Sequence, residues 1–163
     1  MNTPTIYHRT VHSVRTLSSS NHITIRIRAE RHWHSLEPLN KKLRLVVEVE
    51  GKVFENSRTD EIKWEIVWLP NELPNLEAAV DRILFLGTQD ENLADPESEV
   101  FSPVHQAATV GFTNFAGSRL GYIDFRRENR TIRATFADLE ALNDFKNNLS
   151  SAARIKDEGT KAA

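Results

Sequence analysis

The sequence predicts an α+β protein: an antiparallel sheet or open barrel of seven to nine strands, with one internal helix and one C-terminal helix. Three observations support this class. Segments in which apolar and polar residues alternate fill most of residues 5–68, and short connections join them. Three more strand-like segments follow residue 106. Apolar residues recur at helical spacing twice, over residues 73–86 and after Asp138.

The first strands are predicted over residues 5–68. Residues 5–17 are rich in β-branched side chains and lead into the turn-forming segment SSSN, so residues 5–33 are expected to form a long hairpin. In its second strand, every other residue from Ile23 to Ala29 is apolar, as is Trp33, which is typical of a half-buried strand. The segments LRLVVEVEGKVFENS and EIKWEIVWLP predict the next strands, and Pro70 ends the last of them.

Helical spacing replaces the alternation after Pro70. Apolar residues from Leu73 to Leu84 predict a helix over 73–86, which Gly87 would end. Residues 88–103 are acidic, without a basic residue, and predict a mobile inserted loop. Asp138 is expected to cap a final helix with one apolar stripe. Residues 1–156 are therefore predicted to form one globular domain, followed by a flexible tail at 157–163.

Composition limits the classes of protein that the chain can belong to. Its 163 residues include no cysteine, which excludes disulfides, thiolate nucleophiles and zinc sites that use sulfur. No apolar run reaches the roughly 20 residues of a bilayer span, and the first residues lack a secretory pattern, so a cytoplasmic protein is expected. The formal net charge is −2, but residues 1–44 carry +6 and residues 45–104 carry −10. A basic segment of this kind attracts anionic partners.

The C-terminal quarter of the chain, a strand, a turn and a strand followed by TIRATFADLEALNDFKNNLSSA, resembles the closing section of the pleckstrin-homology superfold. In that superfold a last strand runs into a helix that plugs an open barrel. Phe136, Glu140, Phe145 and Leu149 stand at the matching places. The resemblance implies an open barrel closed by the final helix. It also implies a phosphoinositide-binding module as one possible function, because such domains often carry a basic run at the first hairpin.

The segment RAERHWHS places His32 and His34 on one face of a strand, with Trp33 on the other. Neutral imidazoles bind zinc, so these two histidines with His8 or His12 are one possible metal site. The simpler interpretation is a contact face for an anionic partner, without metal or cofactor. The residues predicted to bind the partner are Arg26, Arg28, His32, Trp33 and His34.

An enzyme is the competing interpretation. Glu50 is followed by Glu61 and Lys63, a pattern similar to the metal-binding core of the PD-(D/E)xK nucleases, in which carboxylates hold magnesium and the lysine helps to position water. Cross-strand charge pairing on an exposed sheet gives the same pattern. Apart from this pattern, the sequence contains no recognisable catalytic set.

The sequence therefore favours a non-enzymatic macromolecule-binding protein: an adaptor, an inhibitor or an assembly subunit. Its partner is expected to be a protein with an acidic surface, bound by the basic N-terminal hairpin. Two alternatives stay open: a module that binds phosphate groups, nucleic acid or anionic lipid, and a metal-dependent nuclease that uses Glu50, Glu61 and Lys63.

Overall fold

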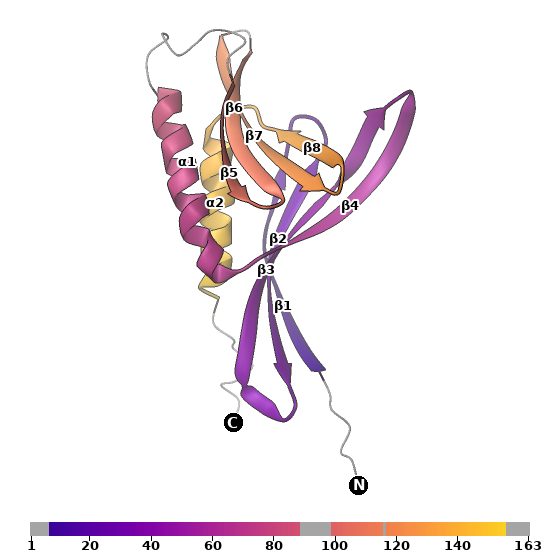
Figure 1. Ribbon diagram of the computed structural model, residues 1–163, viewed down its shortest axis with the longest axis vertical. Helices are drawn as coiled ribbons and strands as arrows, with labels where there is room; N and C mark the ends of the chain where they lie inside the picture. The colour runs from indigo at the N-terminus through magenta and orange to yellow at the C-terminus, as the bar shows by residue number, and fades with distance from the viewer. Residues whose placement is uncertain (1–6, 89–98, 116, 156–163) are drawn as a thin grey trace.

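The computed structural model describes residues 7–88, 99–115 and 117–155. Over these ranges the protein is α+β, with two antiparallel four-stranded sheets and two α-helices (Figure 1). The strands of the first sheet are β1 (Tyr7–Ser18), β2 (Thr24–His34), β3 (Glu37–Glu55) and β4 (Arg58–Trp68). The strands of the second sheet are β5 (Glu99–His105), β6 (Ala108–Phe115), β7 (Ser118–Arg127) and β8 (Arg130–Thr135). A 3-10 turn (Pro70–Glu72) leads into helix α1 (Leu73–Thr88), and α2 (Glu140–Ala153) follows β8.

The same arrangement of elements occurs twice along the chain. In each half, four strands lie in the sheet in the order of the sequence, and a helix follows the fourth strand. The α+β class, the antiparallel pairing and the two predicted helices are confirmed. The described strands do not form one sheet or barrel, because among them β4 pairs only with β3 and β5 pairs only with β6. Helix α1 separates β4 from β5 in the chain.

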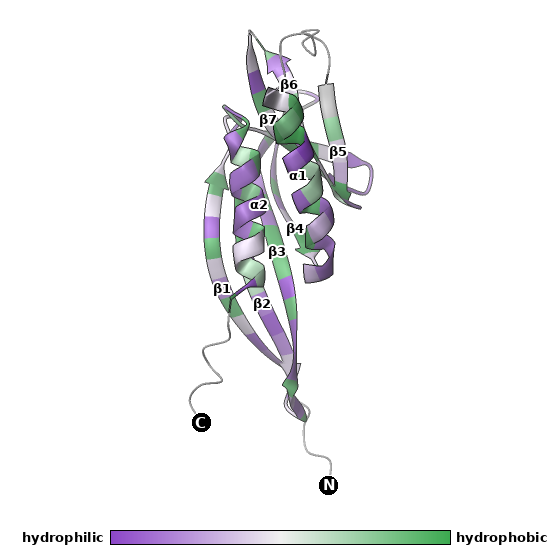
Figure 2. Cartoon of the chain, turned by 90° about the vertical axis from the view of Figure 1, so that its left-hand side faces the viewer, coloured by the Kyte–Doolittle hydropathy of each residue, from purple (hydrophilic) through white to green (hydrophobic). Residues whose placement is uncertain are grey.

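Each helix covers mainly the sheet of the other half. Helix α1 contacts β5 and β6 of the second sheet, whereas α2 contacts β1, β2 and β3 of the first sheet as well as β7. The two helices lie side by side, and their apolar faces join the inner faces of both sheets in one core (Figures 1 and 2). In the described part of the chain, neither helix has the length and hydropathy needed to cross a bilayer.

The inner face of the first sheet follows from the alternation in the sequence. Ile25 and Ile27 on β2 and Val47 on β3 are fully buried, and Trp64 and Trp68 on β4 lie in the same core. The polar residues between them face the opposite side. The predicted apolar stripe of α2 is also buried, since Leu142, Phe145 and Leu149 have no exposed surface. The predicted cap is in place, because Asp138 Oδ1 accepts the backbone N–H of Ala141 at 3.2 Å.

The two sheets also meet at one corner. The turn between β1 and β2 contacts the end of β8. Asn21 Nδ2 donates to the backbone carbonyl of Arg133 at 2.7 Å, and the backbone N–H of Ser20 donates to the backbone carbonyl of Thr135 at 2.8 Å. At the other end of β8, Arg130 forms an ion pair with Asp60 of β4 at 3.3 Å. These contacts fix the second sheet relative to the first.

The predicted loop at 88–103 needs correction at its edges. Thr88 is the last residue of α1, and residues 99–103 belong to β5, where Phe101 pairs with Gly111. Sequence patterns do not predict β5, because proline and acidic residues are uncommon in strands. Pro103 is tolerated there because β5 lies at the edge of its sheet. Residues 89–98 and the predicted tail at 157–163 lie outside the described residues.

The β3–β4 turn gives a stability prediction. Asn56 and Ser57 both have positive φ, 53° and 60°, as a two-residue type I′ turn requires. Asparagine tolerates this conformation, whereas serine does not favour it. Replacing Ser57 with glycine is therefore expected to raise the free energy of unfolding by about 0.5–1 kcal/mol, measured by urea denaturation. An S57G variant no more stable than wild type would show that the turn is not strained.

Candidate functional site

The strands of the first sheet extend beyond both helices. In Figures 1 and 2 the lower parts of β1, β2 and β3 project past the ends of α1 and α2. Arg31 marks the boundary, because its Nη2 donates to the carbonyl of Ile155 just after α2. We call residues 7–12 and 31–44 the arm. Its backbone is paired in the β1–β2 and β2–β3 ladders, and Leu43 packs against the core at its inner end. All of its side chains are half-buried or exposed.

One face of the arm carries a stack of side chains centred on Trp33. His8 pairs with Trp33 across the strands, and their rings are stacked with centroids 5.2 Å apart. Lys41 Nζ lies 4.5 Å from the centroid of the same indole. An ammonium group over an aromatic face is attracted by the ring electrons, which holds Lys41 in place. Trp33 is half-buried by these neighbours, so it presents a rigid rim to solvent.

The other face carries His32 and His34, as the alternation predicts. His32 pairs with Arg9 on β1 and with Lys42 on β3, so three basic or titratable side chains form a row across the arm. His34 lies next to an irregularity in the β2–β3 register, and its ring meets Tyr7 edge-on at 5.4 Å.

The arm is strongly basic. It contains five lysine or arginine residues and one glutamate, together with four histidines. Among the described residues, the charged ends of Lys42 and Arg44 have no hydrogen-bonding or ion-pair partner. Large apolar side chains are exposed on the same arm: Tyr7 is 76% exposed, Leu36 68% and Leu39 98%. Free cations and exposed apolar groups thus occur together at this end of the sheet.

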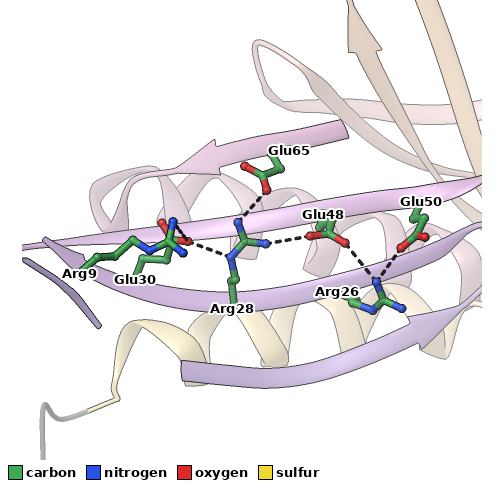
Figure 3. A network of polar contacts seen from close by, with 7 residues as sticks. All are labelled: Arg9, Arg26, Arg28, Glu30, Glu48, Glu50 and Glu65. Carbon is green, nitrogen blue, oxygen red and sulfur yellow. Dashed lines mark hydrogen bonds and ion pairs between the residues drawn. The ribbon is translucent and has the colours of Figure 1, made fainter. Parts of the chain in front are cut away.

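Arg26 and Arg28, which were predicted to bind the partner, lie outside the arm in a network of carboxylates (Figure 3). Arg26 donates to Glu48 at 3.1 Å and to Glu50 at 2.6 Å. Arg28 is the centre of the network: it donates to Glu30 at 2.9 Å, to Glu48 at 3.0 Å and to Glu65 at 2.9 Å. The glutamates outnumber the arginines, so these two arginines do not form a free basic face.

Glu30 is the most buried member of the network, since its side chain is only 6% exposed. Burial alone would raise the pKa of Glu30. The hydrogen bonds from Arg28 and His32, together with the charges of Arg28 and Arg9, outweigh burial and hold that pKa below its usual range. The carboxylate is therefore ionised at neutral pH, and its ion pair with Arg9 links β2 to β1.

The lowered pKa of Glu30 predicts a pH dependence of stability. A carboxyl group whose pKa is lower in the folded than in the unfolded state stabilises the fold fully above its unfolded pKa, near about 4.3. This stabilisation is lost as the pH falls through the folded pKa. We expect a Glu30→Gln variant to lose less unfolding free energy than wild type between neutral and acid pH. Urea denaturation at a series of pH values measures this, and parallel profiles for the two proteins would contradict it.

The histidines proposed as a metal site are divided between the two faces of the arm. His8 and His12 pair with Trp33 and Ala29, so they lie on the face opposite His32. His32 Nε2 instead lies 3.1 Å from Glu30 Oε2. Within the described ranges, no group of three or more His, Asp or Glu side chains is placed to hold a metal ion.

The residues proposed for a nuclease lie on β3 and β4. Glu50 stands directly opposite Lys63, and Lys52 stands opposite Glu61 with their charged atoms 3.9 Å apart. Glu50 accepts a hydrogen bond from Arg26. This geometry matches cross-strand charge pairing, the other interpretation of the same pattern.

Three arm residues were not singled out by the sequence: Lys41, Lys42 and Arg44. They counted toward the basic N-terminal segment, but no motif marked them. The β2–β3 register brings Lys42 opposite His32 and Arg44 opposite Glu30. That register could have been found only by extending β3 back to Glu37, through the proline at position 38.

The chain was compared with known proteins. No protein-family model matches it, and no curated protein matches it either. The resemblance to the pleckstrin-homology superfold therefore stays a prediction.

Proposed function

We propose that this protein is a non-enzymatic macromolecule-binding protein, and that its contact surface is the arm. One observation carries the proposal: among the described residues, the cationic ends of Lys42 and Arg44 have no partner, and the same arm exposes large apolar side chains. Free cations on a projecting element attract an anionic partner over a distance.

The chemistry of the arm favours a protein with an acidic surface as the partner. Protein interfaces combine aromatic or arginine anchors with apolar contact area and a charged rim. Trp33 and Tyr7 supply aromatic rings, and Leu36 and Leu39 supply apolar area at the tip. A surface that binds only phosphate groups has no need of exposed leucines. In this proposal His32, Trp33 and His34 contact the partner. Arg26 and Arg28 act indirectly, because their ion pairs hold together the strands that carry these three residues.

The proposal is tested with a matched pair of charge-reversal variants. One variant carries Lys42→Glu and Arg44→Glu on the arm. The control carries Arg58→Glu and Arg82→Glu, which change the net charge equally at exposed positions off the arm. Partners are captured from a nuclease-treated extract, identified, purified and titrated against each variant. We expect an acidic protein whose dissociation constant rises at least about tenfold for the arm variant and stays unchanged for the control.

Two outcomes would contradict the proposal. Equal loss of binding in both variants would show that net charge, and not the arm, attracts the partner. A partner that disappears after nuclease treatment, with an affinity that falls steeply with salt, would identify a nucleic-acid-binding protein instead.

A further inference from the structure

A cavity lies beside strand β4, away from the arm. Its volume is about 510 Å³. Five consecutive residues of β4, from Lys63 to Val67, form one wall, and His105, Ala107, Arg126 and Arg127 from the second sheet form the other. Successive residues of a strand point to opposite faces, so a wall of consecutive residues runs along the edge of the strand and not over one face. We call this cavity the edge groove.

The edge that faces the groove has unused hydrogen-bonding capacity. Strand β4 pairs with β3 on one side and, over residues 7–88, 99–115 and 117–155, with no strand on the other. In the described residues, no backbone hydrogen bond outside the sheet ladder involves residues 63–67. An edge strand of this kind presents a row of N–H and C=O groups that can pair with another chain.

The groove is positively charged. The charged ends of Lys63, Arg126 and Arg127 have no hydrogen-bonding or ion-pair partner among the described residues. The one carboxylate in the lining, that of Glu65, forms an ion pair with Arg28 at 2.9 Å. Three cations without an ion-pair partner and one paired carboxylate therefore line the groove beside an open strand edge.

His105 is held in place at the wall of the groove by its neighbours. Its Nδ1 accepts the backbone N–H of Ala107 at 3.1 Å, which leaves the ring proton on Nε2, 3.3 Å from a carboxylate oxygen of Glu72. The ring also packs against Trp68, with centroids 4.6 Å apart. His105 thus forms a fixed wall of the groove, and the three cations determine which ligand it accepts.

We infer that the edge groove binds an acidic segment of another protein in extended conformation, which adds to the first sheet as a fifth strand beside β4. Backbone pairing with the open edge gives affinity, and alternate side chains give specificity. Acidic side chains of the added strand would contact Lys63, Arg126 and Arg127. The side chains between them would point to the opposite face, the side of Trp64 and Ile66.

A peptide strand explains more of the groove than a small anion does. Inorganic phosphate would use the cations, but it would leave the backbone groups of residues 63–67 without partners. This site does not depend on the arm: β4 ends opposite Leu45, before the arm begins. The two proposals can therefore fail separately.

The inference is tested with full-length protein and a labelled peptide, Glu-Val-Glu-Thr-Glu-Val-Glu. The matched probe is the same peptide with alternate backbone nitrogens methylated, so that its charge is kept and its strand pairing is lost. Fluorescence anisotropy measures the two affinities. We expect the methylated peptide to bind at least about tenfold more weakly, and an Arg126→Glu/Arg127→Glu variant to bind the unmodified peptide at least about tenfold more weakly than wild type.

The Lys42→Glu/Arg44→Glu arm variant is the control and is expected to bind the peptide like wild type. Hydrogen exchange locates the site: the amides of residues 63–67 should gain protection with the peptide but not with inorganic phosphate. Equal binding of the methylated peptide would overturn the inference in favour of simple charge attraction. Loss of binding in the arm variant would overturn it by placing the peptide on the arm. Near-UV circular dichroism checks that each variant is folded.

Discussion

Replacing Phe145 with alanine is expected to lower the free energy of unfolding by about 3–5 kcal/mol. The ring of Phe145 has no exposed surface, and it meets the indole of Trp68 edge-on at 6.0 Å. Truncation to alanine removes the buried ring and leaves a cavity where α2 packs on the core. Equilibrium denaturation in urea measures the loss.

Phe85→Ala is the matched control for this prediction. Phe85 lies on α1 and is 64% exposed, so the same truncation is expected to change the unfolding free energy by less than about 0.5 kcal/mol. A loss of less than about 0.5 kcal/mol in the Phe145→Ala variant would mean that α2 is not docked through Phe145.

Replacing Arg28 with methionine is expected to lower the free energy of unfolding by about 3 kcal/mol. Methionine keeps most of the side-chain volume but removes the charge that Glu30, Glu48 and Glu65 share. The side chains of Glu30 and Glu48 are 6% and 10% exposed, so they would be left as partly buried charges close to each other. Removing one partner of a buried ion pair costs more than the pair itself contributes, because the remaining charge stays desolvated.

Arg26→Met is the matched control in the same network. Half of the Arg26 side chain is exposed, and water can replace its contacts with Glu48 and Glu50. We expect a much smaller loss than for Arg28→Met. If the two variants lost equal stability, Arg28 would not be the centre of the network. Both variants are compared with wild type by urea denaturation at neutral pH.

Sequence patterns predicted the individual strands better than their arrangement. Alternation from Ile23 to Ala29 and from Ile62 to Trp68 depends only on which face of a strand is buried, and it was sufficient to identify β2 and β4. Which sheet a strand joins depends on packing between distant segments, and the pattern contains no such information. The repeat of four strands and a helix was missed for this reason, since the two halves share a topology without a visible repeat in sequence.

The candidate site was predicted in part, because the sequence indicates which face of a strand a residue lies on but not which residues of other strands lie beside it. His32, Trp33 and His34 were identified because their spacing in one strand determines their faces. The environment of Arg26 and Arg28 could not be predicted, because their partners come from β3 and β4 and depend on the register. The basic residues near the core are thus paired with an excess of glutamates, whereas Lys42 and Arg44 on the arm have no partner among the described residues.

The exchange of helices between the two halves has a consequence for biosynthesis. As the chain leaves the ribosome, the first sheet is complete at Trp68, yet the helix that covers it, α2, begins only at Glu140. Until then the apolar inner face of the first sheet lacks its contacts with α2, and the apolar face of α1 lacks its contacts with the second sheet. Nascent chains that stall before Glu140 would therefore expose an apolar surface of the kind that chaperones bind and that drives aggregation.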